Sequence, residues 1–266
     1  MKSKDSKNWI LPPGGEESKQ IIMDYVLNRS VALLLIEGRN HISIGGSVCV
    51  KLKDRYFLAT AAHNLENISK PSQFRVMPRG ERGFGDDAII SLGASTSHDV
   101  AFLELPEDYI LRKRIEQLQL SDLKLRQRHD LNTAFLICGF PCQEAITHSN
   151  DDIEPVALGV MTSSVDVEND TDRLILQYPP QSELDKGLEL VEPFGLSGCG
   201  VWSFPPFQTN PIWSPSKSQL LGIASSWNES KGYEIAEPME YWLELIALEI
   251  PELRNVIGQY TRGATP

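Results

Sequence analysis

Short apolar segments broken by glycine, asparagine and aspartate dominate this 266-residue chain and constrain its fold more than any other feature. Such segments at short spacing are typical of an all-β barrel or sandwich. The first half contains Val31–Ile36, Val48–Leu52, Tyr56–Ala61, Phe74–Met77, Ala88–Leu92 and Val100–Leu105. A second β-rich stretch contains Ala134–Gly139, Val156–Val165, Leu174–Gln177, Gly200–Phe204 and Leu220–Ser225. The sequence therefore predicts two β halves packed side by side with a cleft between them.

The two ends of the chain and the segment between the β halves have a different pattern. Ile21–Leu27 is expected to form one or two helical turns, and the charged segment Leu111–Leu125 a short helix or connector. Pro238–Ile246 has apolar residues at helical spacing, and Pro251 starts a second short helical segment. We therefore expect five parts: an N-terminal extension (1–29), a first β-barrel (30–110), a connector (111–130), a second β-barrel (131–236) and a C-terminal helical segment (237–266).

The amino-acid composition indicates which kinds of binding partner and which cellular compartment to expect. A net charge of −11 argues against nucleic-acid binding, which usually requires a basic surface. We expect no membrane span, because no apolar run approaches the roughly 18–20 residues that one needs. The N-terminus lacks the apolar core of a secretory signal.

The cysteines point to the same compartment. The four of them are too few for a disulfide framework, and they are not paired at zinc-finger spacing. A bridge between Cys138 and Cys142 is a less favoured alternative. We therefore expect a cytoplasmic protein with reduced thiols, no metal and no cofactor.

Three motifs place catalytic residue types where a strand can give way to a turn. His63 follows the strand-like segment Tyr56–Thr60, Asp99 precedes Val100–Leu105, and Ser197 has glycine on both sides in Gly195-Leu196-Ser197-Gly198. A serine nucleophile needs a base to take its proton, a carboxylate to orient that base and N–H donors for the oxyanion. The order His, Asp, Ser is one of three known routes to such a triad.

These motifs, in this order and on these two halves, resemble those of trypsin-like serine proteases over roughly residues 30–236. Three further segments carry the resemblance: Gly45-Gly46-Ser47 ahead of Ala61-Ala62-His63, Gly139-Phe140-Pro141 as in bacterial members, and Leu221–Ser225. The resemblance implies the chymotrypsin-like fold, with two six-stranded antiparallel β-barrels and a C-terminal helix. It also implies a cytosolic protein of the bacterial type.

The resemblance implies a role for each residue of the trio. His63 is the general base, Asp99 orients it, and Ser197 is the nucleophile. The backbone N–H groups of Gly195 and Ser197 form the oxyanion hole.

Two positions beside the nucleophile depart from the family pattern. Leu196 stands where digestive members have an aspartate that pairs with an N-terminus freed by cleavage, and because leucine cannot form that ion pair we do not expect activation by that route. The oxyanion loop must therefore be preformed, or ordered by a partner or substrate, and we expect regulated activity. Cys199 replaces a glycine and is expected to pack inward as a small hydrophobic residue.

The specificity pocket is less well determined by the sequence. Family spacing puts its base near Val191 and Glu192, where an apolar base favours an apolar substrate side chain and a buried Glu192 favours Arg or Lys. We expect a medium apolar or small residue. Its wall, formed by Ser225, Ser226 and Trp227, fits the family pattern in two registers, and a shift of one residue reverses which side chains face the pocket.

Three functions follow from the resemblance. The first is a serine endopeptidase that cleaves protein or peptide substrates through an acyl-enzyme and is regulated by a partner or substrate. The alternative is a catalytically inactive trypsin-like module that binds peptides in its cleft. The third is a protease domain whose terminal segments dock onto a larger regulatory assembly.

Overall fold

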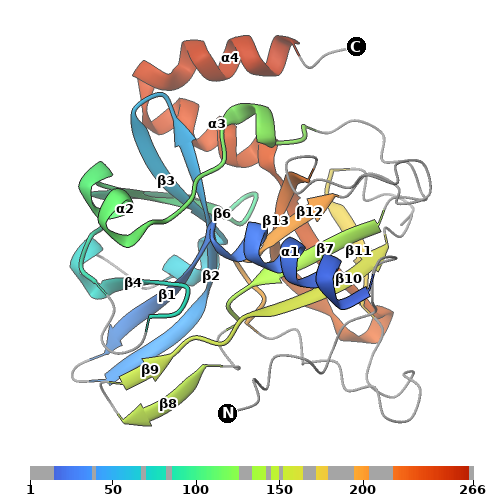
Figure 1. Ribbon diagram of the computed structural model, residues 1–266. Helices are drawn as coiled ribbons and strands as arrows, with labels where there is room; N and C mark the ends of the chain where they lie inside the picture. Colours follow the sequence, from blue (N-terminus) through green and yellow to red (C-terminus); the bar gives the residue numbers. More distant parts are fainter. Residues whose placement is uncertain are drawn as a thin grey trace.

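The chain folds into two six-stranded antiparallel sheets, with helices at both ends (Figure 1). This computed structural model describes residues 15–37, 40–66, 70–81, 86–125, 134–141, 145–149, 152–163, 172–178, 195–203 and 218–263. Each sheet is built from one of the two β-rich stretches of the sequence.

The first sheet has the strand order β4-β1-β2-β3-β6-β5. Its strands are β1 (Ser30–Glu37), β2 (Asn40–Leu52), β3 (Arg55–Thr60), β4 (Phe74–Pro78), β5 (Ser91–Ser95) and β6 (Val100–Leu105). The strand expected at Ala88–Leu92 begins later, and the ladder with β6 runs from Ser91 to Ser95. Gly93 fits this later register because a Cβ there would lie 2.5 Å from the ring of Phe102, so only glycine leaves room for that ring.

The second sheet has the order β10-β7-β12-β13-β14-β11. Its strands are β7 (Ala134–Gly139), β10 (Leu158–Ser163), β11 (Leu174–Gln177), β12 (Gly200–Ser203), β13 (Gln219–Asn228) and β14 (Tyr233–Pro238). The Thr162 hydroxyl donates to the Gln177 carbonyl and so links β10 to β11, the two ends of this sheet. β14 was not expected from the sequence. A separate hairpin joins β8 (Ile146–Ser149) to β9 (Asp152–Glu154).

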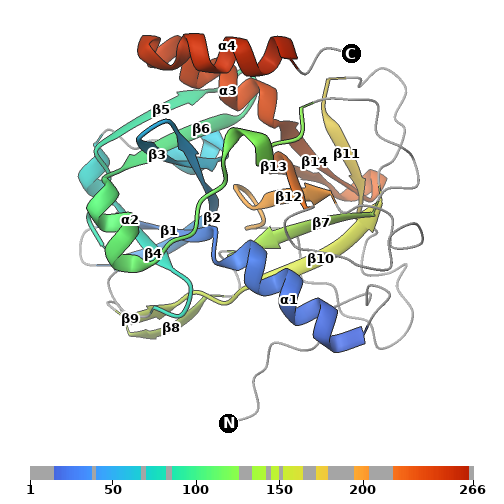
Figure 2. The same cartoon turned by 45° about the horizontal axis from the view of Figure 1, so that its top comes forward.

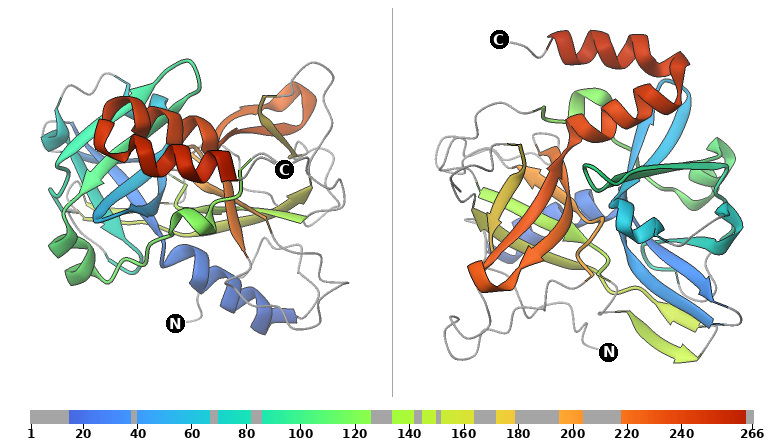
Figure 3. Two further views of the ribbon diagram at one scale, coloured as in Figure 1. Left: turned by 90° about the horizontal axis from the view of Figure 1, so that it is seen from above. Right: turned by 180° about the vertical axis from the view of Figure 1, so that it is seen from behind.

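Four α-helices lie outside the sheets in the described part of the chain: α1 (Gly15–Leu27), α2 (Glu107–Lys113), α3 (Met239–Glu249) and α4 (Arg254–Gly263). Figure 2 shows α1 lying across β7 and β10, and it is longer than the one or two turns expected. Both C-terminal helices were expected, and they lie against one another with α4 outermost (Figure 3). None of the described helices has the length and apolar character that a membrane crossing requires.

Among the residues that the structure describes, three clusters of buried side chains form the core. The first belongs to the first sheet and includes Leu58 and Leu103, and the second belongs to the second sheet and includes Ile137 and Leu221. The third and largest draws on both sheets and on α1, α3 and α4, and includes Trp242. This third cluster joins the two halves of the molecule.

The pairing of strand β1 explains why its sequence is apolar at every position from Val31 to Ile36. Val31 and Leu33 belong to the core of the first sheet, whereas Ala32 and Leu34 belong to the core between the sheets. A strand buried on both faces has a continuous apolar sequence instead of the alternation of a half-buried strand.

Candidate active site

His63 and Asp99 meet at one edge of the first sheet because β3 and β6 are neighbouring antiparallel strands. Thr60, the last residue of β3, pairs with Ala101 near the start of β6, so the residues beyond these strand ends lie together. A short 3₁₀ turn (Ala62–Leu65) follows β3 and carries His63. Asp99 occupies the turn before β6 and has a left-handed backbone with φ of 44°, which aspartate tolerates better than most residues.

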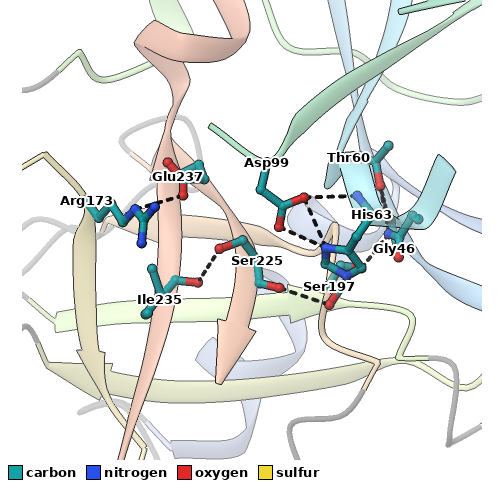
Figure 4. A network of polar contacts seen from close by, with 10 residues as sticks. Gly46, Thr60, His63, Asp99, Arg173, Ser197, Ser225, Ile235 and Glu237 are labelled. Carbon is teal, nitrogen blue, oxygen red and sulfur yellow. Dashed lines mark hydrogen bonds and ion pairs between the residues drawn. The ribbon is translucent and has the colours of Figure 1, made fainter. Parts of the chain in front are cut away.

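The Asp99 carboxylate holds His63 through both its ring and its backbone. The His63 Nδ1 atom lies 2.8 Å from Asp99 Oδ2 and 3.1 Å from Oδ1, and the His63 backbone N–H donates to Oδ1 at 2.9 Å (Figure 4). Because an ionised carboxylate only accepts hydrogen bonds, Nδ1 carries the proton and Nε2 is left as the basic nitrogen. The hydrogen bond to Asp99 raises the pKa of His63 above 6.5, although burial works in the opposite direction.

Ser197 lies in a tight turn that leads into β12 of the second sheet. Gly195 and Gly198 on its two sides have positive φ angles of 94° and 84°, a backbone conformation that residues other than glycine rarely adopt. The Ser197 hydroxyl donates to the Ser225 carbonyl at 3.3 Å (Figure 4). Within the described residues it makes no hydrogen bond to His63. The sequence-predicted trio is therefore assembled as an Asp99–His63 pair on one sheet and Ser197 on the other.

Three backbone N–H groups in the turn around Ser197, those of Gly195, Leu196 and Ser197, have no acceptor among the residues that the structure describes. Those of Gly198 and Cys199 donate to the carbonyls of Ala224 and Leu196, each at 2.8 Å. Of the three groups without an acceptor, those of Gly195 and Ser197 are the two that the resemblance assigns to the oxyanion hole. Two unpaired N–H groups next to a serine hydroxyl can bind an oxyanion.

The residues that depart from the family pattern anchor this turn by packing. Leu196 is fully buried in the core of the second sheet, and Cys199 is buried there too, as expected of it. The fit around Cys199 is close, since a Cβ added at Gly46 or Gly139 would lie within 2.8 Å of its sulfur. Apolar burial on both sides of Ser197 therefore holds the turn.

The wall of the expected pocket takes a single register in the structure. A β-bulge between Ala224 and Ser226 buries Ser225 and directs its carbonyl to the Ser197 hydroxyl, whereas Ser226 is exposed. Trp227 is half-buried, with its ring 6.4 Å from that of Tyr178. Val191 and Glu192, the expected pocket base, lie outside the described residues.

Two residues adjacent in the sequence to His63 and Asp99 make further contacts in the structure. The ring of His98, which directly precedes Asp99, stacks on Tyr241 of α3 with 3.8 Å between centroids. Asn64 was not singled out, yet its side chain lies 3.1 Å from the Ser197 carbonyl. The only signal in the sequence was its position directly after His63. Across the described ranges no three His, Cys, Asp or Glu side chains are grouped so that they could hold a metal ion.

The two six-stranded antiparallel sheets and the C-terminal helices define a chymotrypsin-like fold, which confirms the fold expected from the sequence. Among solved structures, an inactivated protease paralogue from the scabies mite matches with a TM-score of 0.52 and 15% sequence identity. The match covers 86% of this chain and 96% of that chain. No protein-family model and no curated protein matches the sequence. At this level of identity the structural match shows the fold alone.

Proposed function

We propose that the protein is a serine endopeptidase that cleaves peptide bonds through an acyl-enzyme on Ser197. The observation that carries the proposal is the Asp99–His63 pair, with 2.8 Å between carboxylate and Nδ1, at the junction with the turn that holds Ser197. Further support comes from the two N–H groups at Gly195 and Ser197 that have no acceptor among the described residues.

The proposed reaction begins with a rotation of the Ser197 hydroxyl away from the Ser225 carbonyl. The hydroxyl gives its proton to His63 Nε2 while its oxygen attacks the substrate carbonyl, and the resulting oxyanion accepts from the Gly195 and Ser197 N–H groups. The C–N bond breaks as His63 returns the proton to the leaving amine, which forms the acyl-enzyme. Water then repeats the sequence and releases the acid, and the Asp99 carboxylate stabilises the imidazolium in both halves.

We also propose the finer points of the sequence analysis. Three points remain proposals: the division of the chain at residues 30–110, 111–130 and 131–236, a bacterial-type cytoplasmic setting, and regulation by a partner or substrate. Reduced cysteines are supported by Cys49 and Cys138, which are buried and unbridged. The substrate is a protein or peptide, and neither nucleic acid nor membrane is a proposed partner.

Labelling with a fluorophosphonate probe tests the proposed activity. We expect the wild-type protein to be labelled and Ser197→Ala not to be, with His63→Ala slowed by about 10⁴-fold or more, the loss typical of serine proteases. Equal labelling of wild type and Ser197→Ala would place the reactive group elsewhere and overturn the proposal.

A catalytically inactive peptide-binding module is the second candidate. It is favoured by the hydrogen bond of the Ser197 hydroxyl to Ser225 instead of His63, and by the match to a protein described as an inactivated protease paralogue. In that case the fluorophosphonate probe would not label the wild-type protein. Wild type and Ser197→Ala would bind the same peptides from a library with equal affinity.

A further inference from the structure

The carbonyl group of Ser197 is held by the first sheet, although Ser197 itself belongs to the second half. The Gly46 N–H on β2 and the Asn64 side-chain amide both donate to this oxygen, each at 3.1 Å. Because Asn64 directly follows His63, the same short turn carries the ring nitrogen that faces Asp99 and the amide that holds Ser197.

Thr60 closes these contacts into a ring. The second proton of the Asn64 amide points to the Thr60 hydroxyl at 3.1 Å, and that hydroxyl donates to the Gly46 carbonyl at 2.8 Å (Figure 4 draws this last bond). Both amide protons of Asn64 are thereby used, and Thr60 and Asn64 are both buried. A buried polar network with all its donors satisfied rigidifies the groups that it connects.

The backbones around this ring approach so closely that no Cβ atom fits between them. A Cβ at Gly198 would lie 2.1 Å from the Gly46 carbonyl oxygen and 2.3 Å from the Thr60 hydroxyl. A Cβ at Gly45 would lie 2.5 Å from the Ser197 carbonyl oxygen and 2.7 Å from the Asn64 amide nitrogen. Glycine at these two positions therefore allows the backbones of the two halves to come into contact, and the turn around Ser197 cannot shift without breaking that contact.

We propose that Asn64, supported by Thr60, is a positioning residue that fixes the Ser197 turn relative to His63 across the two sheets. This inference rests on the proposed function for its effect on the reaction. The Asn64 amide donates a hydrogen bond to the carbonyl of Ser197 itself, and this bond fixes the position of the Ser197 hydroxyl. A displacement of a reacting group by about 1 Å can lower the rate about 100-fold. Asn64 does not touch the reacting atoms, so its loss should slow the chemical step and leave probe binding unchanged.

The test measures fluorophosphonate labelling of the full chain at several probe concentrations, which separates the maximum rate from the half-saturating concentration. We expect Asn64→Ala to lower the maximum rate by about 10- to 100-fold with little change in half-saturation. Thr60→Val, which keeps the shape and loses the hydroxyl, should show a smaller loss of the same kind. Thr60→Ser keeps a hydroxyl at this position and should be labelled at a rate within about twofold of wild type.

Ile115→Ala is the control for general destabilisation, because Ile115 is buried in the core of the first sheet and makes none of these contacts. It should lower the melting temperature and leave the maximum labelling rate unchanged. Labelling of Asn64→Ala at the wild-type maximum rate would overturn the proposal, as would an equal loss in Ile115→Ala.

Hydrogen–deuterium exchange of residues 195–203 separates this inference from the proposed function. We expect faster exchange there in Asn64→Ala and Thr60→Val, and not in Ile115→Ala. If the wild-type protein is not labelled at all, the proposed activity fails while faster exchange still supports the role of Asn64 in holding the turn. Unchanged exchange in Asn64→Ala would overturn that role whether or not the protein is active.

Discussion

At the scale of single residues, the electrostatics of His63 set the pH range in which Ser197 can react. The imidazole must be neutral to accept the serine proton, and the hydrogen bond to Asp99 raises its pKa above 6.5. The labelling rate should therefore rise with pH through the His63 pKa and be lost as pH falls below it.

Asp99→Asn removes the carboxylate that raises this pKa. We expect the midpoint of the pH–rate profile to move to lower pH and the maximum rate to fall by about 10⁴-fold, because the amide no longer selects the reactive tautomer. Labelling from pH 5 to 9, with NMR titration of the imidazole in Ser197→Ala, measures both effects. His148→Gln is the matched control, since His148 lies 3.0 Å from a carboxylate of Glu154 on the separate β8–β9 hairpin. An unchanged midpoint in Asp99→Asn would mean that the carboxylate does not control the base.

The catalytic residue types were predictable because each lies in a short local motif, whereas their supporting contacts were not. Ser225 could not be assigned to one register because the bulge that buries it depends on pairing with β14. Asn64 is missed for a similar reason: an asparagine after a strand usually indicates a turn. Its amide finds the Ser197 carbonyl only when the two halves of the chain come together.

At the scale of elements, α3 supports the strand that begins beside Asp99. The Trp242 Nε1–H donates to the Ala101 carbonyl of β6 at 3.1 Å, and the neighbouring Tyr241 stacks on His98. Trp242 is fully buried and contributes to the core between the sheets. The helix therefore stabilises the edge of the first sheet that presents the Asp99–His63 pair.

Trp242→Phe keeps an aromatic ring and removes the N–H donor. We expect it to lower the free energy of unfolding by about 1–3 kcal/mol, because the Ala101 carbonyl loses its partner, whereas Trp242→Ala should cost about 3–5 kcal/mol. Urea denaturation measures both variants. Leu248→Ala on the same helix is the control, since Leu248 is exposed and should change stability by less than about 0.5 kcal/mol. Equal stability of Trp242→Phe and wild type would show that the hydrogen bond contributes nothing net.

Strands with both faces buried were readily predicted, because their sequences are almost entirely apolar: β1 is apolar from Val31 to Ile36, and β6 is apolar except for Glu104. β14 was missed because its sequence carries Glu234 and Glu237, which suggest a solvated turn. Both glutamates are at most 2% exposed in the folded chain. The segment pairs with β13 across the short turn 229–232 and with β11, which lies more than 50 residues earlier in the chain, and this second pairing is not visible in the local sequence.

At the scale of the whole molecule, two sheets with separate cores are joined by a shared third core and by the contacts around Ser197. The second sheet contains a buried acid that links the stability of the entire fold to pH. Glu234 is 1% exposed, its Oε2 atom has no hydrogen-bond partner among the described residues, and burial raises the pKa of its carboxyl from 4.5 to about 9. The folded protein therefore keeps this group protonated at neutral pH.

This protonation predicts that stability falls as pH rises. Between pH 4.5 and about 9 the unfolded chain has released the Glu234 proton while the folded chain retains it, so unfolding releases a proton and becomes easier at higher pH. Each pH unit in this window should cost roughly 1 kcal/mol of unfolding free energy from this group. Glu234→Gln keeps the shape and cannot ionise. We expect this variant to be more stable than wild type at pH 8 and similar in stability at pH 4, because the Gln side chain and the protonated Glu side chain are both uncharged and similar in shape. Urea denaturation across this pH range measures the difference. Parallel stability curves for the two proteins would show that Glu234 does not hold its proton in the folded state.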